Sequence, residues 1–360
     1  MKVNGKPFRS IWSDDVKRVV HIIDLTRLPF AFETLALTNC DEAAHAIRSM
    51  QVRGAPLIGV TAAFGVALAM QRSATDDALT SAIATLTVTR PTAVNLGWAL
   101  RTMEKHLSPL PQQQRADAAW VLAKRLADDD VATNEAIGEH GLGIIGALHK
   151  KLARPINILT HCNAGWVATV DWGTALACIY KAHEAGIPVH VWVDETRPRN
   201  QGLLTAWELR EQGVPHTYIV DNAGGHLMQH GNVDMVLVGA DRVSSCGDVA
   251  NKIGTYLKAL AAFDNGIPFY AALPFSTIDA TLTDALKEIE IEERGESEVR
   301  AVTGLQAENA PEAAPVLVVD QRTPVANPAF DVTPARLVTA IITEHGVFAP
   351  ADLSAALASR

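Results

Sequence analysis

The segment that decides the fold is Pro155-Ile156-Asn157-Ile158-Leu159-Thr160-His161-Cys162-Asn163-Ala164-Gly165, where a short apolar run ends in a polar turn. Further apolar runs of this kind follow at Pro188–Val193, His216–Val220, Met235–Val238, Phe269–Leu273 and Val316–Val319. The runs are β-branched, almost continuously apolar and interleaved with helical stretches, which is typical of parallel strands covered on both faces. The sequence therefore predicts an α/β domain over residues 151–360, built on a doubly wound, Rossmann-like parallel sheet.

The first 150 residues differ from this pattern. Stretches such as Ser81–Leu86 and Ala116–Leu126 carry apolar residues at the three- and four-residue spacing of amphipathic helices. The β-branched segment Val19–Ile23 predicts a short strand near the start. We therefore expect a mainly α-helical N-terminal domain over residues 1–150, with a small β element, which suits a chain of 360 residues.

Two C-terminal segments carry further expectations. Residues 288–315 are charged and lack periodicity, which indicates a surface loop rather than a regular element. Thr333 and Pro334 are typical of the cap and first position of a helix, so we expect a helix that runs to about Gly346.

Composition limits the partners and the compartment. The chain is 48% hydrophobic and 20% charged, and its formal net charge of −9 opposes non-specific binding to nucleic acid or anionic lipid. No run approaches the roughly 18 apolar residues of a membrane span. The four cysteines are widely separated, which suits a reducing compartment. We expect a cytoplasmic protein with no nucleic-acid or membrane partner, in which a local basic pocket could still bind a phosphorylated small molecule.

Chemically active residues follow the predicted strands. Because ligands of open parallel sheets bind beyond the carboxyl ends of the strands, the segments after each run form a candidate site. These segments are His161–Gly165, Asp194–Pro198, Asp221–Gly225 and Gly239–Arg242.

Within this set, Cys162 is a candidate nucleophile or base. It precedes a helix expected to begin near residues 169–173, and a helix N-terminus favours the thiolate. The alternative is that Cys162 is a small buried hydrophobe. Asp241 is a candidate general acid, because partial burial at the end of its strand would raise its pKa. A cap or an ion pair with Arg242 is the alternative for Asp241.

Three basic residues stand beside small residues and are candidate anion ligands: Arg53, Arg90 and Lys252. Gly54 would let the backbone approach a ligand, and a helix that begins near Pro56 would present its positive N-terminus to a phosphate. The alternative for each is an ordinary solvated surface charge.

Two other patterns are discounted. The glycines of residues 141–146 match G-x-G-x-x-G, but they precede the first strand, whereas a dinucleotide fingerprint follows it. We interpret them as packing between domains, and this leaves oxidoreduction with a dinucleotide a remote alternative. His161, Cys162, His226 and Cys246 lack metal-site spacing, so no metal is expected.

Taken in order, long segments of the chain resemble the methylthioribose-1-phosphate isomerases, in the larger family that includes the α, β and δ subunits of translation initiation factor 2B and ribose-1,5-bisphosphate isomerase. The segments are Arg53–Gly59, Arg90–Leu96, Leu159–Gly165, Glu195–Pro198 with Gln201-Gly202, Gly239–Val243, Gly247–Tyr256 and Asn327–Pro334.

This resemblance implies conversion of S-methyl-5-thio-α-D-ribose 1-phosphate to S-methyl-5-thio-D-ribulose 1-phosphate in methionine salvage, with no redox cofactor or metal. It makes Cys162 and Asp241 the catalytic pair. It assigns substrate binding to Arg53, Gly54, Ala55, Arg90, Gln201, Asn251 and Lys252. It also implies a homodimer formed through the C-terminal domain, with the site in the cleft between the domains.

Two kinds of alternative remain at this point. A non-catalytic regulatory subunit of the initiation factor 2B type would share the fold, although the presence of Cys162, Asp241 and Lys252 together counts against it. An isomerase of another pentose phosphate, either 5-deoxyribose 1-phosphate or ribose 1,5-bisphosphate, would use a similar site. A second phosphate would require a second basic cluster, whereas a methylthio group requires an apolar pocket.

Overall fold

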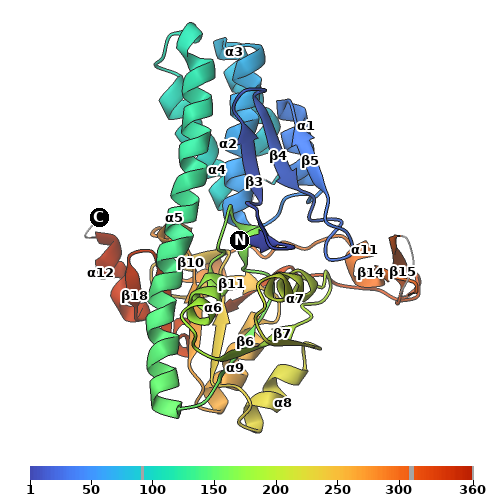
Figure 1. The fold of residues 1–360 in the computed structure, drawn as a ribbon, viewed down its shortest axis with the longest axis vertical. Coiled ribbons are helices and arrows are strands. Elements are labelled where there is room, and N and C mark those ends of the chain that lie inside the picture. The colour runs from blue at the N-terminus through green and yellow to red at the C-terminus, as the bar shows by residue number, and fades with distance from the viewer. Residues whose placement is uncertain (91–92, 308–311, 359–360) are drawn as a thin grey trace. The chain divides into compact units, whose positions relative to one another are not determined.

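The computed structural model of the chain describes residues 1–90, 93–307 and 312–358 (Figure 1). Its internal contacts define two compact units. The N-terminal unit comprises Met1–Glu135 and Gly165–Gly173, and the C-terminal unit comprises Ala136–Ala164 and Thr174–Arg360. The mixed α/β class predicted from the sequence is confirmed, with a helical N-terminal region and a mostly parallel sheet in the C-terminal region.

The N-terminal unit is a helical layer with small antiparallel sheets. Its strands are β1 (Lys2–Val3), β2 (Lys6–Pro7), β3 (Ile11–Asp14), β4 (Val19–Ile23) and β5 (Thr34–Leu37). Its helices are α1 (Cys40–Arg48), α2 (Ala55–Arg72), α3 (Asp76–Thr87), α4 (Val94–Leu107) and the first part of α5 (Gln112–Leu152). Strands β3, β4 and β5 form one antiparallel sheet, so the strand predicted at residues 19–23 is confirmed.

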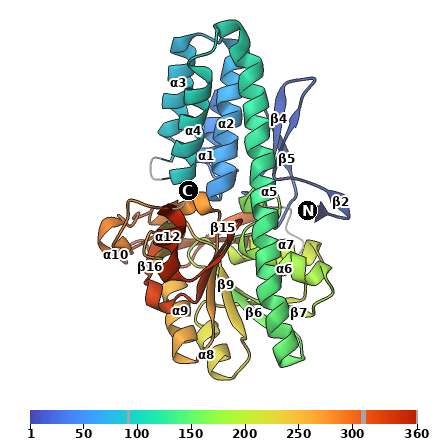
Figure 2. The same cartoon turned by 90° about the vertical axis from the view of Figure 1, so that its left-hand side faces the viewer.

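Helix α2 forms the core of this unit. It packs against α1, α3 and α4 (Figure 2). Among the described residues it is the one helix long and apolar enough to cross a membrane, yet 72% of its 18 residues are buried in the structure. Such burial is typical of a core helix in a globular protein.

The C-terminal unit is built on a seven-stranded sheet in the order β18-β17-β12-β9-β6-β7-β8. The strands are β6 (Ile156–Thr160), β7 (Val189–Asp194), β8 (His216–Ile219), β9 (Met235–Val238), β12 (Phe269–Ala272), β17 (Ala340–Thr343) and β18 (Gly346–Phe348). All neighbours pair in parallel except β17 and β18. The six parallel strands follow the doubly wound order, whose direction of winding reverses between β6 and β9.

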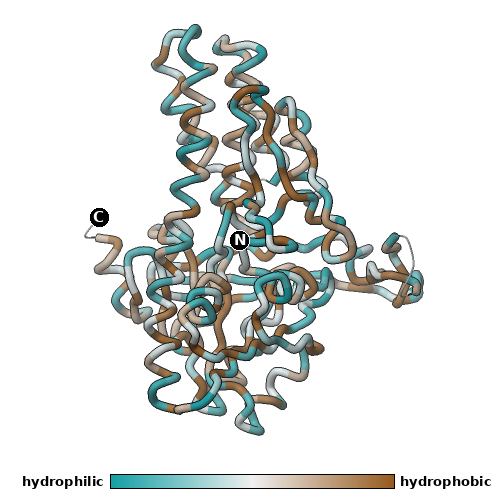
Figure 3. The backbone as a smooth tube through the Cα atoms, viewed as in Figure 1, coloured by the Kyte–Doolittle hydropathy of each residue, from teal (hydrophilic) through white to brown (hydrophobic). Residues whose placement is uncertain are grey.

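Helices cover both faces of this sheet, which explains why its central strands, such as β9, are apolar and buried, whereas the edge strand β8 is partly exposed (Figures 2 and 3). Helices α6 (Ala175–Glu184) and α7 (Gly202–Glu211) lie on one side, and α8 (Ala223–Gln229) and α9 (Thr255–Asp264) lie on the other. Five of the six predicted runs form strands of this sheet. The hydrophobic cluster beneath α9 includes Leu159, Val236 and Phe269.

A second, four-stranded sheet has the order β13-β10-β11-β16, and a separate hairpin pairs β14 with β15. The strands are β10 (Arg242–Ser244), β11 (Val249–Lys252), β13 (Ile278–Asp279), β14 (Ala301–Leu305), β15 (Ala313–Leu317) and β16 (Phe330–Thr333). Short helices α10 (Ala285–Glu288), α11 (Ser297–Arg300) and α12 (Leu353–Ala358) complete the unit.

Three predictions for the C-terminal region are wrong. The sixth apolar run, Val316–Val319, does not join the main sheet, because β15 pairs with β14 in the hairpin. That hairpin and α11 also replace much of the loop expected over residues 288–315. The helix expected from Thr333 to about Gly346 is instead β16, a short 3-10 turn at Ala335–Leu337, and β17. Its β-branched residues pair along β12, and this tertiary pairing overrides the local capping signal.

The glycines of residues 141–146 lie within α5, and Gly141 packs inside the C-terminal unit. A Cβ atom added at Gly141 would lie 2.2 Å from the Cys178 Sγ atom of α6. This contact crosses the predicted boundary at residue 150 but lies within one compact unit, where Gly141 allows close contact between two helices.

We expect Gly141→Ala to lower the free energy of unfolding by about 1–3 kcal/mol, because the new methyl group overlaps Cys178. Gly143→Ala is the matched control. Gly143 lies in the same helix with nothing within 4 Å of the added atom, so its replacement should stabilise the protein by up to about 1 kcal/mol. Urea unfolding of both variants measures the difference, and equal effects would contradict the packing explanation.

Asp130 anchors residues 165–173 to α5 within the N-terminal unit. Its carboxylate accepts a hydrogen bond of 2.7 Å from the Val170 backbone N–H group. Burial raises the pKa of Asp130 to about 7, with a smaller contribution from the charge of Asp171.

This shift predicts a pH-dependent stability. Between pH 4 and about 7 the folded protein holds a proton at Asp130 that the unfolded chain has released, so stability falls as the pH rises through this window. Asp130→Asn stays neutral and can still accept from Val170. Between pH 4 and pH 8, the free energy of unfolding of the variant should rise relative to that of wild type by on the order of 2–4 kcal/mol. Asp129→Asn, at an exposed neighbour, should show no such gain in urea unfolding at the two pH values.

Candidate active site

The two predicted catalytic residues follow adjacent strands at the point where the sheet reverses its winding. Cys162 comes two residues after β6 and Asp241 comes three residues after β9. These strands pair in parallel, with Ile158 opposite Met235. The loops that follow approach each other closely, because a Cβ atom added at Gly239 would lie 2.8 Å from the Ala164 Cβ atom. Such a switch point is where doubly wound sheets bind their ligands.

The backbone of Cys162 is held at both ends by threonine hydroxyl groups. Its N–H group donates to the Thr196 Oγ1 atom at 2.8 Å, and its carbonyl oxygen accepts from the Thr205 Oγ1 atom at 2.8 Å. Cys162 has a φ of +67° and Thr196 a φ of +61°, a left-handed conformation that costs an L-residue about 1–2 kcal/mol. The contacts of the β7–α7 segment thus impose a strained backbone at the half-buried thiol.

The helix expected near residues 169–173 begins later, at Ala175. Residues 165–173 instead form a 3-10 turn at Trp166–Ala168 that is closed by a bridge between Gly165 and Gly173. The predicted start of this helix at residues 169–173 is therefore wrong, because these residues belong to the turn and the bridge.

Asp241 lies in the connection from β9 to β10. Its N–H group donates to the Ala250 carbonyl oxygen at 3.0 Å, and Arg242 pairs with Ala250 in the β10–β11 register. Continuation of this register places Asp241 opposite Asn251. The expected partial burial of Asp241 is wrong, because the connection leaves the sheet edge and its side chain is exposed. Arg242, the alternative partner, forms an ion pair of 3.0 Å with Asp279.

Three predicted substrate ligands lie on the same unit as Cys162 and Asp241. Gln201 precedes α7 and is buried, and its Oε1 atom has no hydrogen-bond partner among the described residues. The buried Asn251 donates to the Thr255 Oγ1 atom at 3.1 Å. The Lys252 Nζ atom donates to the Ala329 carbonyl oxygen at 3.0 Å and lies 4.4 Å from the centroid of the Phe330 ring. An unsatisfied buried acceptor such as Gln201 favours a ligand that donates a hydrogen bond.

The remaining predicted ligands belong to the N-terminal unit. Arg53 and Arg90 are both half-buried, which disfavours the alternative of fully solvated surface charges. Gly54 caps α2 with a φ of +94°, and Ala55 begins that helix, as predicted. The space beside Gly54 is filled by Ala168, whose carbonyl oxygen would lie 2.2 Å from an added Cβ atom. Pro91 and Thr92 of the predicted Arg90 motif lie outside the described residues.

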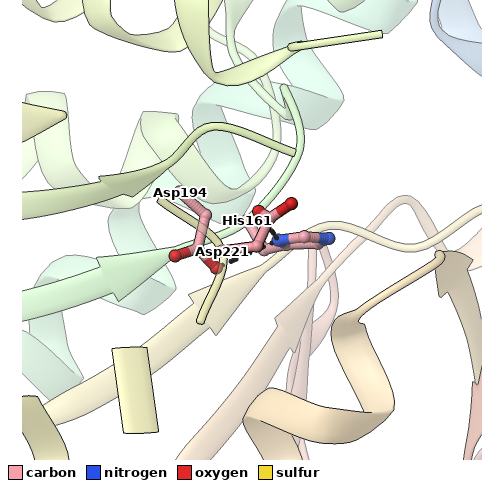
Figure 4. A group of neighbouring side chains, drawn as sticks. All are labelled: His161, Asp194 and Asp221. Atoms are coloured by element: carbon pink, nitrogen blue, oxygen red, sulfur yellow. Dashed lines mark hydrogen bonds and ion pairs between the residues drawn. The ribbon is translucent and has the colours of Figure 1, made fainter. Parts of the chain in front are cut away.

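A buried charged cluster lies directly behind Cys162. The Nδ1 atom of His161 is 3.0 Å from Asp194 Oδ2 and 3.9 Å from Asp221 Oδ1 (Figure 4). Its Nε2 atom lies 2.8 Å from the Ile253 carbonyl oxygen, which can only accept. Both ring nitrogens of His161 therefore lie at hydrogen-bond distance from protein oxygen atoms.

Lys258 of α9 completes this cluster. Its Nζ atom is 3.1 Å from Asp194 Oδ2 and donates to the Asp221 carbonyl oxygen at 2.6 Å. The oxygen and nitrogen atoms of His161, Asp194 and Asp221 lie close enough together to form a set of metal ligands. Both ring nitrogens of His161 already contact protein oxygen atoms, however, and the Lys258 ammonium already binds Asp194 Oδ2 as a cation. The cluster therefore fits a charge-compensated network better than a metal site.

A second ionic cluster holds the β7–α7 segment from its other side. Glu298 of α11 accepts from Arg199 Nη1 at 2.8 Å and from Arg294 Nη2 at 2.7 Å. Burial opposes ionisation of Glu298, but the hydrogen bonds and charges of Arg294 and Arg199 outweigh it and lower its pKa to about 2. Arg199 precedes Gln201 by two residues, so this cluster fixes the chain that carries the buried amide.

Sequence reasoning found His161, Asp194, Thr196 and Asp221 as members of the strand-end segments but assigned no role to Thr205, Glu208 or Lys258. Glu208 is buried in α7 and accepts from Asn163 Nδ2 at 2.8 Å and from Tyr180 at 2.9 Å. The available signal for Lys258 was a single charge among the apolar residues Tyr256–Ala262 of an expected helix. A lysine on the apolar face of a helix is buried only with a charged partner, so this pattern could have directed a search for an acidic residue at the strand ends.

Comparison with known proteins agrees with this architecture. Residues 51–350 match the initiation factor 2 subunit family. The methylthioribose-1-phosphate isomerase of Acidiphilium cryptum (strain JF-5) is 62% identical over 351 residues, which cover 97% of this chain and 95% of that protein. The chain therefore belongs to the initiation factor 2 subunit family, and the resemblance seen in the sequence is confirmed.

Two crystal structures resemble the whole chain. That of 5-methylthioribose 1-phosphate isomerase from Pyrococcus horikoshii OT3 is 38% identical with a TM-score of 0.83, and the match covers 98% of this chain and 96% of that one. That of translation initiation factor eIF-2B, subunit delta, from A. fulgidus is also 38% identical, with a TM-score of 0.80 and coverages of 96% and 97%.

The ionic cluster at Glu298 predicts an acid-sensitive contribution to stability. Glu298→Gln should cost about 1–3 kcal/mol at pH 7, because the charge-assisted contacts with two arginines, Arg199 and Arg294, are lost. The folded pKa lies below the unfolded value of 4.5, so the contribution is complete above that value and disappears as the pH falls towards about 2.

Urea unfolding at pH 7 and pH 3 measures this change, and the cost of Glu298→Gln should be smaller at pH 3. Glu296→Gln is the control, because the Glu296 carboxylate that pairs with Arg300 is itself exposed, and it should change stability little at either pH. Equal costs for Glu298→Gln at both pH values would contradict the assignment.

Proposed function

We propose that this chain is an aldose–ketose isomerase that converts S-methyl-5-thio-α-D-ribose 1-phosphate to S-methyl-5-thio-D-ribulose 1-phosphate, a step of methionine salvage. The observation that carries the proposal is the contact between the Cys162 and Asp241 loops at the switch point of the sheet. The 62% identity to the A. cryptum isomerase over nearly the full length of both chains supports the substrate.

In this proposal the catalytic residues belong to a domain over residues 151–360, and the substrate's polar groups are bound by Gln201, Asn251 and Lys252. The phosphate is bound by Arg53, Arg90 and the backbone at Gly54 and Ala55, where α2 begins. Half-burial of both arginines supports their role as anion ligands. The unsatisfied Gln201 Oε1 atom supports a hydrogen bond from a sugar hydroxyl group.

The phosphate on the anomeric carbon prevents spontaneous opening of the sugar ring, so the ring must be opened with assistance. In the proposed mechanism, exclusion of water when the substrate binds favours the acid form of Asp241. This acid donates a proton to the ring oxygen as the bond from this oxygen to C1 breaks. The hydrogen on C2 then moves to C1, while the C2 hydroxyl group becomes the ketone and its proton returns to Asp241.

Two routes balance this hydrogen transfer. Cys162 as a thiolate removes the C2 hydrogen as a proton and returns it to C1 through an enediol. Alternatively, the hydrogen moves directly with its electron pair, and Cys162 stabilises the developing charge. Only the first route allows exchange with solvent.

We further propose that the enzyme is a cytoplasmic homodimer, which follows from the resemblance to the isomerases and from the four widely separated cysteines.

The test is a phosphorus and proton NMR time course with methylthioribose 1-phosphate in deuterated water. Wild type should replace the aldose 1-phosphate signals by those of the ketose 1-phosphate, and Cys162→Ala and Asp241→Asn should each lower the rate by about 10²–10⁴-fold. Deuterium at C1 of the product indicates the thiolate route, and retained protium indicates the hydride route.

Near-normal turnover by one variant would remove that residue from the mechanism and leave the reaction in place. Absence of turnover by folded wild type would contradict the substrate, and 5-deoxyribose 1-phosphate and ribose 1,5-bisphosphate would then be tested. If the protein converts none of these sugar phosphates, the alternative is a regulatory role of the initiation factor 2B type, which the 38% identity to the A. fulgidus subunit supports.

A further inference from the structure

We propose that Lys258 is a positioning residue for Cys162, an inference that rests on the isomerase function proposed above. Lys258 lies on α9, on the opposite side of the sheet from α7, and it is buried together with His161 and Asp194. Its Nζ atom contacts Asp194, which binds His161 next to Cys162, and the carbonyl oxygen of Asp221, whose carboxylate holds Thr196 against the Cys162 N–H group.

The first connection runs through Asp194 to the residue before the thiol. Lys258 and the His161 Nδ1 atom bind the same oxygen, Asp194 Oδ2, at 3.1 Å and 3.0 Å. His161 is fixed on its other side by the Ile253 carbonyl oxygen, immediately before α9. Gly254, with a φ of +101°, allows this approach, since an added Cβ atom would lie 3.0 Å from the His161 ring. The histidine ring is therefore clamped between β7 and the start of α9.

The second connection runs through Asp221 to Thr196. The Lys258 ammonium holds the Asp221 carbonyl oxygen at 2.6 Å, and the Asp221 carboxylate accepts from the N–H groups of Thr196 and Arg197, each at 2.8 Å. Thr196 in turn accepts from the Cys162 N–H group and donates to the Asp194 carbonyl oxygen at 3.2 Å. The network closes on itself around the strained residue.

The charges explain why a lysine is needed at this position. Asp194 is fully buried, and its Oδ1 atom has no hydrogen-bond partner among the described residues, so Oδ2 carries its stabilisation. Without Lys258, Asp194 and His161 would remain as a pair, and Asp221 would keep only its longer contact of 3.9 Å with the His161 Nδ1 atom and its indirect link through Thr196. The segment Thr196–Arg197 could then relax, and Cys162 with it, because a left-handed backbone persists only where its surroundings impose it.

The test compares Lys258→Met with the matched control Lys287→Met, both in a Cys246→Ser background that removes the exposed thiol. Lys287 is 81% exposed and pairs with Asp284. Turnover of methylthioribose 1-phosphate and the rate of Cys162 alkylation by iodoacetamide, located by peptide mass spectrometry, are measured. Burial raises the pKa of Cys40 to about 11 and of Cys178 to about 12, so these thiols should react slowly.

Lys258→Met should lower kcat by about 10²-fold with KM changed by less than about 3-fold, and should change the Cys162 alkylation rate several-fold. The control should change neither. Unaltered kcat and alkylation in folded Lys258→Met would overturn the proposal, as would a loss of activity that matches only a loss of folded protein. Ethylammonium should partly restore Lys258→Ala.

If neither Lys258 variant folds, Thr196→Val decides, because it removes the hydroxyl group that accepts from Cys162 while it keeps the size of the side chain. A fall in kcat with altered alkylation supports the proposal, and wild-type behaviour overturns it. If wild type does not convert the substrate, the proposed function fails, and the alkylation rates alone still test the positioning role.

Discussion

The rest of the C-terminal unit depends on one constraint, the burial of both faces of its parallel sheet. Strand β9 is buried along its whole length and β6 is buried at every residue except the half-buried Asn157, so helices must cover both sides. A chain that covers both sides has to reverse its winding once, between β6 and β9. That reversal leaves the two following loops side by side, and it brings a thiol and a carboxylate to one edge although they are far apart in the sequence.

Packing alone would leave those loops free to vary, and polar contacts remove this freedom. The left-handed backbone at Cys162 is held by threonine hydroxyl groups and that at Thr196 by the half-buried Asp221 carboxylate. Behind them lie the buried side chains of Asp194, His161 and Lys258. Burial of such charges is costly unless each is paired, so the network is stable only as a whole. Because each buried charge needs its partner, the network is rigid, and a reacting thiol requires a rigid position.

The sequence predicted those elements whose local pattern agrees with their tertiary surroundings. The run at Ile156–Thr160 and the turn at His161–Gly165 are such a case. The segment after Thr333 was mispredicted, because its capping residues favour a helix while β17 is selected by its pairing with β12. The exposure of Asp241 and the role of Lys258 depend on contacts between distant segments, which no local pattern contains.

The central claim is that Cys162 and Asp241 act on one bound sugar phosphate. It is tested most directly by protection of Cys162 in the inactive Asp241→Asn variant, with methylthioribose 1-phosphate at saturating concentration and iodoacetamide as the probe. The account predicts that the substrate slows alkylation of Cys162 at least about 10-fold and leaves the exposed Cys246 unchanged. Equal alkylation of Cys162 with and without substrate, in a variant shown by calorimetry to bind it, would contradict the claim.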